Sequence, residues 1–482
     1  MNFRMIFNII GKVVCVEAAF LLPALVISAC CGEWSAVLGF AVSAAAMLAF
    51  GLPLTRLKPK RTDVFARDGM IAAGLAWLIV SLLGALPFLI SGAIPGYIDC
   101  IFETVSGFTT TGATILGDVE SLPKGILYWR SFTHWLGGMG VLVFLMILNP
   151  LTAKNSGENM HLLRAESPGI RITKLVPRMK DSAAILYLIY IVLTVLEFVF
   201  LVCGSVPVFD SVTIALGTAG TGGFAIRNDS LASYSAYTQW VVSAFMFLFS
   251  VNFSLYFLMV VRRFRNVARN EELRAFLGLI VVSVAVIMIN TQRYYGSFEE
   301  NLRTSVFQVL SILSTSGFCT TDFDLWPQLS RTLLVLLMFC GACAGSTGGG
   351  SKVIRIQLLL KTARRGIYRT LHPNAVRLIR QDGEVVDEDT VHSVSAYYLL
   401  YFAVIAAGTL LISVDGFSLE SNFTAVVSCM NNIGPGMDAV GAVMNYGGFS
   451  VFSKLILSVI MLIGRLEIYP ILALFIPSVW RK

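Results

Sequence analysis

Apolar stretches of about twenty residues, separated by short polar or basic loops, recur along the whole chain. A helix of that length crosses the roughly 30 Å hydrocarbon core of a bilayer. The pattern predicts an amino-terminal hairpin of helices near 12–31 and 35–53, followed by eight further membrane crossings. Those eight are expected near 69–91, 126–149, 182–203, 237–261, 274–291, 331–360, 393–413 and 450–479. The chain is therefore predicted to be an all-α polytopic membrane protein with ten crossings.

Between the members of each later pair of crossings lies a shorter apolar stretch, followed by a segment that contains glycine. The short stretches, 99–109, 209–219, 301–314 and 419–431, are too brief to cross a bilayer. The glycine segments read TTTGAT (109–114), AGTGGFA (219–225), STSGFCT (314–320) and NNIGPGM (431–437). Aligned on Gly112, Gly223, Gly317 and Gly434, they are 111, 94 and 117 residues apart. Non-helical backbone is tolerated at membrane depth only inside protein or along a water-filled cavity, so we predict four re-entrant loops.

Four equivalent loops around one axis are what a cation filter requires. Backbone carbonyls must replace the hydration shell of the ion, and glycine reaches the necessary backbone angles at least cost. Helix packing through small residues is the alternative explanation of such segments. Helix packing accounts for GGMG (137–140). It does not account for a glycine segment that recurs four times, each time directly after a short apolar stretch.

The repeats give the chain a predicted domain organisation. Four parallel pseudo-repeats of helix, re-entrant pore loop and helix are expected around one pore, after an amino-terminal two-helix hairpin. The hairpin is assigned to 1–54 and the pore modules to 68–150, 181–262, 273–360 and 392–482.

Composition and charge agree with a membrane protein and predict its orientation. Hydrophobic residues make up 56% of the chain and charged residues 13%, against roughly 25% charged in soluble domains. Most of the 36 Lys and Arg lie in 56–67, 154–180, 262–274, 352–380 and at the two ends. By the positive-inside rule these loops and both termini are cytoplasmic. Their alternation with membrane segments argues against nucleic-acid binding.

The intervening loops are acidic, and we expect them to face outward and concentrate cations near the pore. Their acidic residues are Asp99, Glu103, Asp118, Glu120, Asp210, Asp229, Glu299, Glu300, Asp322, Asp324, Asp415 and Glu420.

The segment AGSTGGGSK (344–352) interrupts what would otherwise be one inner helix. Each of its three consecutive glycines costs about 1 kcal/mol of helix stability relative to alanine. We predict an intramembrane gating loop at 344–350, on the cytoplasmic side of the filter, because the other three inner helices lack such an insert. The alternative is a packing kink. The predicted gate residues are Gly345, Ser346, Thr347, Gly348, Gly349 and Gly350.

Arg465 lies within an apolar stretch, where an arginine is costly and functional by default. Glu467 is two residues away on a helix and therefore on a different face. We expect Arg465 to point into the pore below the filter and contact the gating loop; the alternative is snorkelling to an interface. His134 is interpreted as structural. The lone acids Glu17 and Glu197 could couple transport to protons, but packing against backbone or lipid-interface donors is the preferred explanation, and neither is counted among the site residues.

Six motifs together resemble a known family. They are SGFTTTGAT (106–114), GTAGTGGF (217–224), STSGF (314–318), GACAGSTGGGSKVIR (341–355), NNIGPG (431–436) and GRLEIYP (464–470). They are similar to the Trk/Ktr/HKT superfamily of potassium transporters, and the leading hairpin favours its bacterial TrkH/TrkG type. The resemblance implies potassium uptake across the bacterial inner membrane, with potassium as substrate and no cofactor in this chain.

The resemblance also implies site residues and partners. Ion-coordinating backbone would come from Thr110, Thr111 and Gly112; Thr221, Gly222 and Gly223; Thr315, Ser316 and Gly317; and Asn432, Ile433 and Gly434. It implies a homodimer in which each chain holds its own pore, above cytoplasmic TrkA-like regulatory subunits that bind NAD or ATP. The basic loops 154–180 and 361–380, including Arg364 and Arg365, are expected to dock such a regulator.

Two other classes of function were weighed. A symporter coupling potassium to protons or sodium by alternating access usually shows inverted repeats, whereas these modules are predicted to be parallel. An enzyme lacks support, because the chain has no HExxH motif and no phosphate-binding loop of correct spacing. None of the four segments matches the TVGYG filter of ordinary potassium channels, so we expect looser selectivity.

Overall fold

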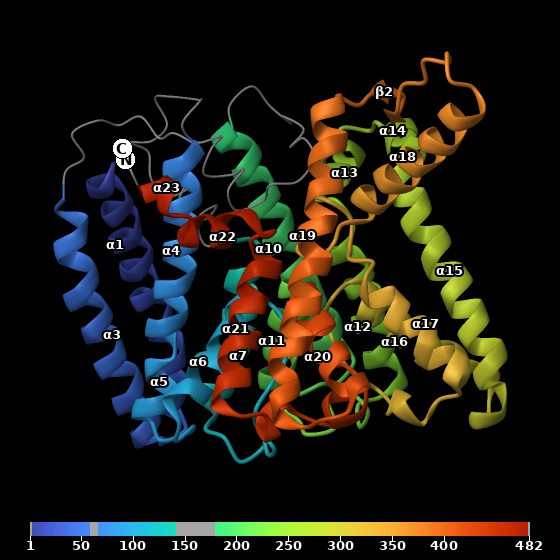
Figure 1. Cartoon of the computed structure of the whole chain (residues 1–482). Helices are drawn as coiled ribbons and strands as arrows, with labels where there is room; N and C mark the ends of the chain where they lie inside the picture. Colours follow the sequence, from blue (N-terminus) through green and yellow to red (C-terminus); the bar gives the residue numbers. More distant parts are fainter. Residues whose placement is uncertain (1, 58–65, 141–178, 481–482) are drawn as a thin grey trace.

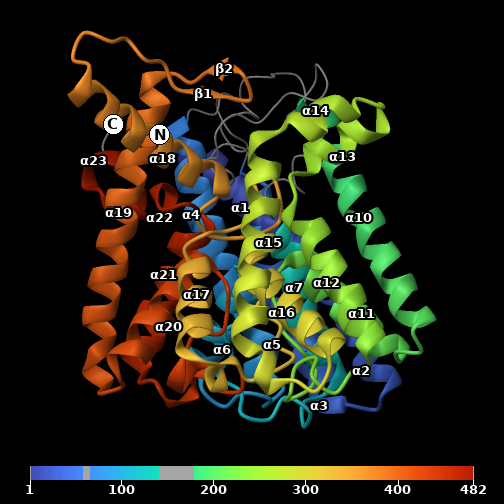
Figure 2. The same cartoon turned by 90° about the vertical axis from the view of Figure 1, so that its right-hand side faces the viewer.

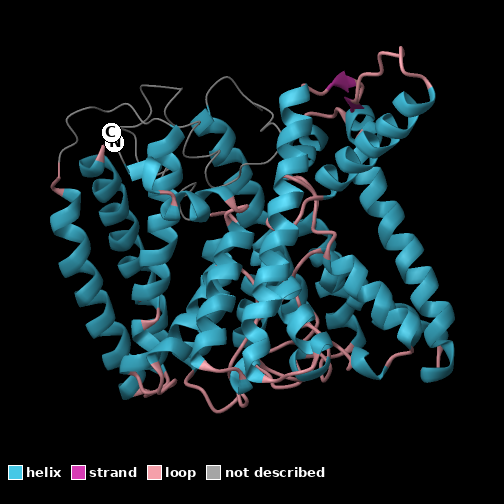
Figure 3. Cartoon of the chain, in the orientation of Figure 1, coloured by secondary structure: helices cyan, strands magenta, loops and turns pink. Residues whose placement is uncertain are grey.

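The computed structural model describes residues 2–57, 66–140 and 179–480, and the statements below concern these residues. The described part is almost entirely helical (Figure 3). Its one sheet has two antiparallel strands, β1 (Arg380–Gln381) and β2 (Glu384–Val385). The first described helix begins, and the last one ends, on the same side of the molecule, the upper side in Figure 1.

Six helical spans of the described part are long and apolar enough to cross a membrane: Phe3–Cys30, Trp34–Thr55, Arg67–Ile90, Ala183–Cys203, Glu271–Tyr294 and Glu388–Asp415. They are built from α1 (Phe3–Phe20), α2 (Leu22–Cys30), α3 (Trp34–Thr55), α4 (Ala66–Gly84), α5 (Leu86–Ile90), α10 (Met179–Cys203), α15 (Glu271–Thr291) and α19 (Glu388–Ile412). The short 3-10 turns η2 (Gln292–Tyr294) and η4 (Ser413–Asp415) extend the last two. The chain is a polytopic all-α membrane protein, as the hydrophobic pattern predicted.

The inner helices are less regular than the sequence suggested. The expected continuous crossing 237–261 is two helices, α12 (Ala236–Ser250) and α13 (Phe253–Val260), bent by 91° at their junction. The stretch 331–360 is divided into α17 (Gln328–Met338) and α18 (Val353–Leu371). The stretch 450–479 is divided into α21 (Val451–Arg465), α22 (Tyr469–Phe475) and α23 (Pro477–Trp480). The first inner helix begins as α7 (Lys124–Gly138), and residues 141–149 of its predicted extent lie outside the described part.

The prediction that only the third inner helix is interrupted is therefore wrong. Local backbone features account for the other two breaks. Asn252 begins α13 as a new helix, because its side chain accepts the Ser254 amide hydrogen at 2.9 Å. Glu467 and Ile468 have φ values of 55° and 74°, which end the preceding helix. Three inner helices, not one, are broken in the half of the molecule that holds the termini (Figure 1).

Four short helices occupy the opposite half of the molecule, where their labels gather in both views (Figures 1 and 2). They are α6 (Tyr97–Phe108), α11 (Val208–Gly220), α16 (Phe298–Leu313) and α20 (Leu419–Asn431). Each ends at one of the four glycine segments. Each has an acidic residue in its first turn, which opposes the positive end of the helix dipole.

The remaining described elements are connections. They are α14 (Phe264–Arg269), η3 (Phe323–Leu325), η5 (Asp438–Val440) and η6 (Tyr446–Gly448).

Half of the twelve acidic residues expected to attract cations form salt bridges in the described part of the chain. Glu103 is not in a loop at all, but is buried in α6. Salt bridges join Asp99 to Lys454 (2.7 Å), Asp210 to Arg227 (3.3 Å), Glu299 to Arg303 (3.0 Å), and both Asp324 (3.5 Å) and Glu420 (2.7 Å) to Arg331. These basic partners cancel part of the negative field, so the paired acids attract cations less than the sequence suggested.

Asp324 gives the fold a pH dependence that can be measured. It lies after the third glycine segment and accepts the Asp438 amide hydrogen at 3.1 Å. Burial raises the pKa of Asp324 to about 6, although nearby Arg331 opposes the rise. Because the folded protein holds this proton more tightly than the unfolded chain, stability falls as pH rises from about 4 through 6. Asp324→Asn should flatten this part of the melting temperature against pH, whereas exposed Asp229→Asn should leave the wild-type slope.

Candidate ion-conduction site

The four glycine segments share one backbone conformation, although their sequences differ. In each segment three consecutive residues are the ones expected to coordinate an ion, and the first of these three has positive φ: Thr110 (55°), Thr221 (54°), Thr315 (60°) and Asn432 (54°). The third residue does too: Gly112 (79°), Gly223 (76°), Gly317 (76°) and Gly434 (102°). The residue between them does not have positive φ in any segment. In a β-strand, successive backbone carbonyls point to opposite sides. The change in the sign of φ along these three residues departs from a strand and allows their carbonyls to face one side.

The segments form a closed ring in the order of the sequence. A Cβ atom built on each glycine would meet the carbonyl oxygen of the middle residue of a neighbouring segment. The pairs are Gly112 with Gly222, Gly223 with Ser316, Gly317 with Ile433, and Gly434 with Thr111, the last at 2.7 Å. The structure thus brings together all twelve residues named for the filter. The fourth segment has the same pattern of positive φ as the other three.

The short helices direct their carboxyl ends at this ring. Thr221 caps α11 and Asn432 caps α20, and both are themselves first residues of a glycine segment. The carboxyl end of a helix carries a partial negative charge of about half an electron. Four such ends around one ring favour a cation near it.

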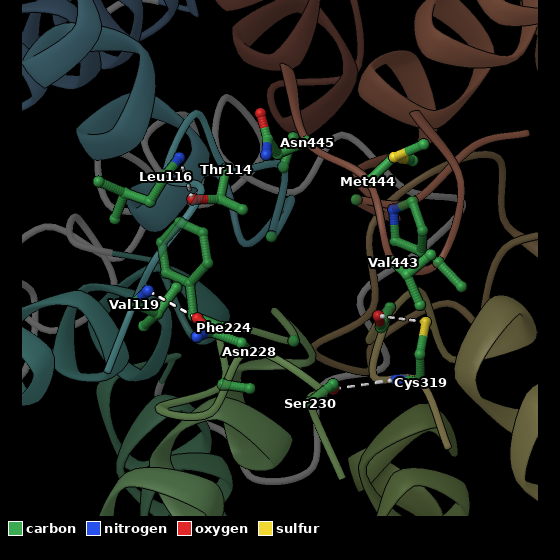
Figure 4. Close-up of a pocket in the computed structure, with 18 of the residues that line it drawn as sticks. Thr114, Leu116, Val119, Phe224, Asn228, Ser230, Cys319, Val443, Met444 and Asn445 are labelled. Atoms are coloured by element: carbon green, nitrogen blue, oxygen red, sulfur yellow. Dashed lines mark hydrogen bonds between the residues drawn. The ribbon is translucent and has the colours of Figure 1, made fainter. Parts of the chain in front are cut away.

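One side of the ring opens into a vestibule (Figure 4). This cavity, of about 120 Å³, has Gly112, Gly223, Gly317 and Gly434 among its lining residues. Figure 4 shows side chains from separate segments around its opening, including Leu116, Asn228, Cys319 and Met444. The vestibule lies on the side of the molecule away from the chain termini.

The other side of the ring is covered by the interruption between α17 and α18. Part of this loop is bonded to the bend between α12 and α13. The Cys343 amide donates to the Ser250 carbonyl (3.0 Å), and the Phe253 amide donates to the Gly345 carbonyl (3.0 Å). The loop therefore satisfies backbone groups that the bend in the neighbouring helix leaves without helical partners.

The glycines of the loop lie directly against the ring. The Gly349 amide donates to the Thr315 hydroxyl at 2.7 Å, and the Ser351 amide donates to the Asn431 side chain at 3.3 Å. A Cβ on Gly349 would lie 2.7 Å from that of Asn432. Glycine is needed here because the loop approaches the filter too closely for any side chain.

Arg465 anchors the loop from α21, in the position expected from sequence. Its guanidinium donates to the Thr347 carbonyl at 2.9 Å. It also donates to the carbonyls of Gly138 (2.8 Å) and Gly137 at the end of α7. One guanidinium therefore ties the loop of the third module to the inner helix of the first.

Two residues that hold the loop were missed from sequence. Lys352 is buried, and its ammonium group donates to the Gly348 carbonyl. Glu272, at the start of α15, accepts the amide hydrogens of Ala344 (2.8 Å) and Ile354 (3.2 Å) with one carboxylate oxygen. It thereby fastens both ends of the loop. Glu272 looks like an ordinary acid of a first helical turn, so local sequence gave no signal for this role.

Glu467 does not pair with Arg465 but with Arg355 of α18. The Arg355 guanidinium also lies over the ring of Tyr397, 4.3 Å from its centre. This buried pair joins the start of α18 to the break between α21 and α22.

A buried ion pair supports the ring of glycine segments. Glu103 of α6 and Arg130 of α7 are 2.7 Å apart and almost fully buried. Glu103 also accepts the Ile115 amide hydrogen (3.1 Å), and Arg130 donates to the Ala225 carbonyl (3.1 Å). The pair therefore braces the first two glycine segments just beyond their glycines. The sequence pattern predicted Glu103 in an outer loop, and no local pattern indicated a role for Arg130.

His134 has the structural role that was expected, and it serves the filter. Its Nε2 accepts the Phe224 amide hydrogen at 3.2 Å, so its Nδ1 carries the proton and donates to the Gly107 carbonyl at 2.8 Å. A Cβ on Gly222 would strike the imidazole ring. The histidine thus fixes the second glycine segment against the first short helix.

Arg130→Met should destabilise the protein strongly, because it leaves Glu103 as an unpaired buried charge. Such a change costs about 3–5 kcal/mol, and adding Glu103→Gln should restore part of the loss. The midpoint of thermal unfolding in detergent measures both. Arg303→Met removes a helical i,i+4 pair with the exposed Glu299 and should cost about 0.5 kcal/mol. Equal effects of the two arginine changes would contradict a bracing role for the buried pair.

The fold and the ring define a class: a helical membrane protein with four re-entrant segments around one axis, suited to passing cations. Comparisons with known proteins identify the group. The model of the TrkH family, described as cation transport protein, matches residues 39–482. The chain belongs to the TrkH family, and it is a transport protein rather than an enzyme.

Individual relatives agree over nearly the whole chain. The chain is 35% identical to the Trk system potassium uptake protein TrkH of Halomonas elongata, over the full length of both. It is 34% identical to TrkH of Escherichia coli over 88% of each chain. The crystal structure of the potassium transporter TrkH from Vibrio parahaemolyticus superposes with a TM-score of 0.89, at 31% identity and full coverage of both chains.

Proposed function

We propose that this protein takes up potassium across a membrane through the four-segment ring. The observation that carries the proposal is the closure of the ring, in which each glycine abuts a carbonyl of the neighbouring segment. Relatives at 34–35% identity are named potassium uptake proteins. The family implies no cofactor, and potassium is the substrate.

The twelve residues of the ring coordinate the ion mainly through backbone carbonyls. Potassium is large and gives up its water readily enough for carbonyl oxygens to replace it. Each segment contributes three residues, so the series of coordinating positions is short. Selection of potassium over sodium is expected to be present but modest.

The loop 344–350 is the gate in this proposal. It lies against the ring on the side opposite the vestibule, and Arg465 and Lys352 place two positive charges there. Positive charge beneath a cation filter raises the electrostatic barrier to a passing cation. Opening therefore requires the loop to leave its hydrogen bonds to Arg465, Lys352 and Glu272.

The chain is oriented with both termini in the bacterial cytoplasm, and it acts as a homodimer with a TrkA-like regulator that binds NAD or ATP beneath it. The basic loops support this orientation. One predicted docking residue needs correction, because Arg365 is buried and pairs with Glu388. Arg364 is exposed and stays a docking candidate. Loop 154–178 lies outside the described residues.

Potassium–proton symport is the second candidate, and one observation favours it. Glu17 is only 3% exposed, and its carboxylate oxygens make no hydrogen bond to the described part of the chain. An ionisable group buried in a membrane span is often functional. Glu17→Gln should abolish uptake if a proton travels with potassium, and leave it intact if the ring is a simple pore.

Growth of a bacterium without its own potassium uptake tests the proposal. Wild-type protein should restore growth at low potassium, and variants of the ring that still reach the membrane should not. Restoration by ring variants at wild-type efficiency would refute transport through the ring.

A further inference from the structure

The closed gating loop is bonded to the filter itself. Thr315 is the first residue of the third filter segment, and its hydroxyl oxygen accepts the Gly349 amide hydrogen at 2.7 Å. Both residues are buried. Closure therefore does more than obstruct the path below the filter, because it engages an oxygen of the filter.

Residues equivalent to Thr315 carry side-chain oxygens in every segment: Thr110, Thr221 and Asn432. The Thr110 hydroxyl oxygen and the Asn432 amide oxygen are buried, and neither is hydrogen-bonded to the described part of the chain. A Cβ built on Gly349 would lie 3.0 Å from the Asn432 amide oxygen. The same loop glycine thus meets oxygens of two filter segments. A buried oxygen without a partner is costly, and a cation would remove that cost.

We propose that the side-chain oxygens of Thr110, Thr315 and Asn432 contribute to an innermost potassium site, for which the ion and the Gly349 amide compete. The proposal rests on the proposed function. The amide hydrogen carries partial positive charge, so it and a cation cannot share the Thr315 oxygen without repulsion. Potassium at this site therefore weakens the closed loop, and potassium itself promotes opening of the gate.

Thermodynamic linkage relates the effect of potassium on loop opening to the effect of loop opening on potassium affinity. If opening raises the affinity of the innermost site for potassium by some factor, potassium shifts the loop toward the open state by the same factor. A single hydrogen bond within a protein contributes enough to change an equilibrium about twofold to tenfold. The expected effect lies in that range.

Hydrogen–deuterium exchange of the purified full-length protein measures the loop directly. Exchange of amides in 344–352 should be about twofold to tenfold faster in potassium chloride than in choline chloride. Sodium should have a smaller effect. Thr315→Val keeps the shape of the side chain and removes its hydroxyl, so exchange should be fast in both salts. Thr315→Ser keeps the hydroxyl and should behave as wild type.

Gly349→Ala tests the same contact from the other side, in case Thr315→Val does not fold. Its methyl group would press on Asn432, so the loop should exchange faster in choline and respond less to potassium. Exchange that is equal or slower in potassium than in choline, in the folded wild type, would overturn the competition.

A second readout separates this proposal from the proposed function. If potassium is transported and raises the melting temperature while loop exchange is unchanged, the filter stands and the coupling is wrong. If potassium is neither transported nor changes the melting temperature, the proposed function fails, and the coupling fails with it.

Discussion

Arg465→Ala should raise basal potassium flux at least about tenfold in proteoliposomes that contain no other protein. The wild-type guanidinium donates to Thr347 of the loop and to Gly137 and Gly138 of α7. Hydrogen bonds to a charged group contribute about 1.5–3 kcal/mol each, and 1.4 kcal/mol is a factor of ten. The change also removes a positive charge beneath the filter. Uptake of rubidium or potassium measures the result.

Deletion of Ser346–Gly350 should have the same effect, and combining it with Arg465→Ala should add little, because both act on one element. Arg465→Lys keeps the charge but loses the planar donor group, so its flux should be intermediate. Arg4→Ala removes an exposed guanidinium far from the ring in sequence and should leave basal flux unchanged. Wild-type or lower flux in folded Arg465→Ala and in the deletion would place the gate elsewhere.

Gly112→Ser should reduce both potassium flux and selection of potassium over sodium, the permeability ratio falling about tenfold or more. Gly112 has φ of 79°, where a side chain costs about 1–3 kcal/mol. The added Cβ would also fall on the Gly222 carbonyl oxygen. That oxygen belongs to the ring, so it must move and spoil the coordination geometry. Reversal potentials under opposed potassium and sodium gradients give the ratio.

Gly92→Ser is a matched control for this change. Gly92 also has positive φ, 75°, but a Cβ there meets no atom within 4 Å. It carries the backbone strain without the clash. A permeability ratio that is unchanged in folded Gly112→Ser, or changed equally by both variants, would remove Gly112 from the filter.

The four glycine segments could be found from sequence because their backbone requirements are local. Each segment needs positive φ at its third position, and that requirement selects glycine at Gly112, Gly223, Gly317 and Gly434. The six unbroken spans of the described part were visible for a similar reason, since each is one continuous apolar run. The interruption before Lys352 was visible because three glycines lie together.

The breaks in the second and fourth inner helices could not be predicted, because they do not depend on glycine. The bend near Asn252 is matched by hydrogen bonds to a loop about ninety residues later in the chain. The supports of the site were hidden in the same way. Glu103 and Arg130 are 27 residues apart, and Glu272 lies 72 residues before Ala344. Such partners are set by tertiary packing, which no local pattern encodes.

The most direct test of the central claim is the reversal potential of purified protein in a planar bilayer. The Arg465→Ala variant is used because its gate is expected to be open. Potassium is placed in excess on one side of the bilayer, sodium on the other, and the proton gradient is set in either direction. The four-segment ring predicts a current that reverses close to the potassium equilibrium potential and does not shift when the proton gradient is reversed. A reversal potential that follows the proton or sodium gradient, or does not distinguish potassium from sodium, would contradict a potassium-selective pore.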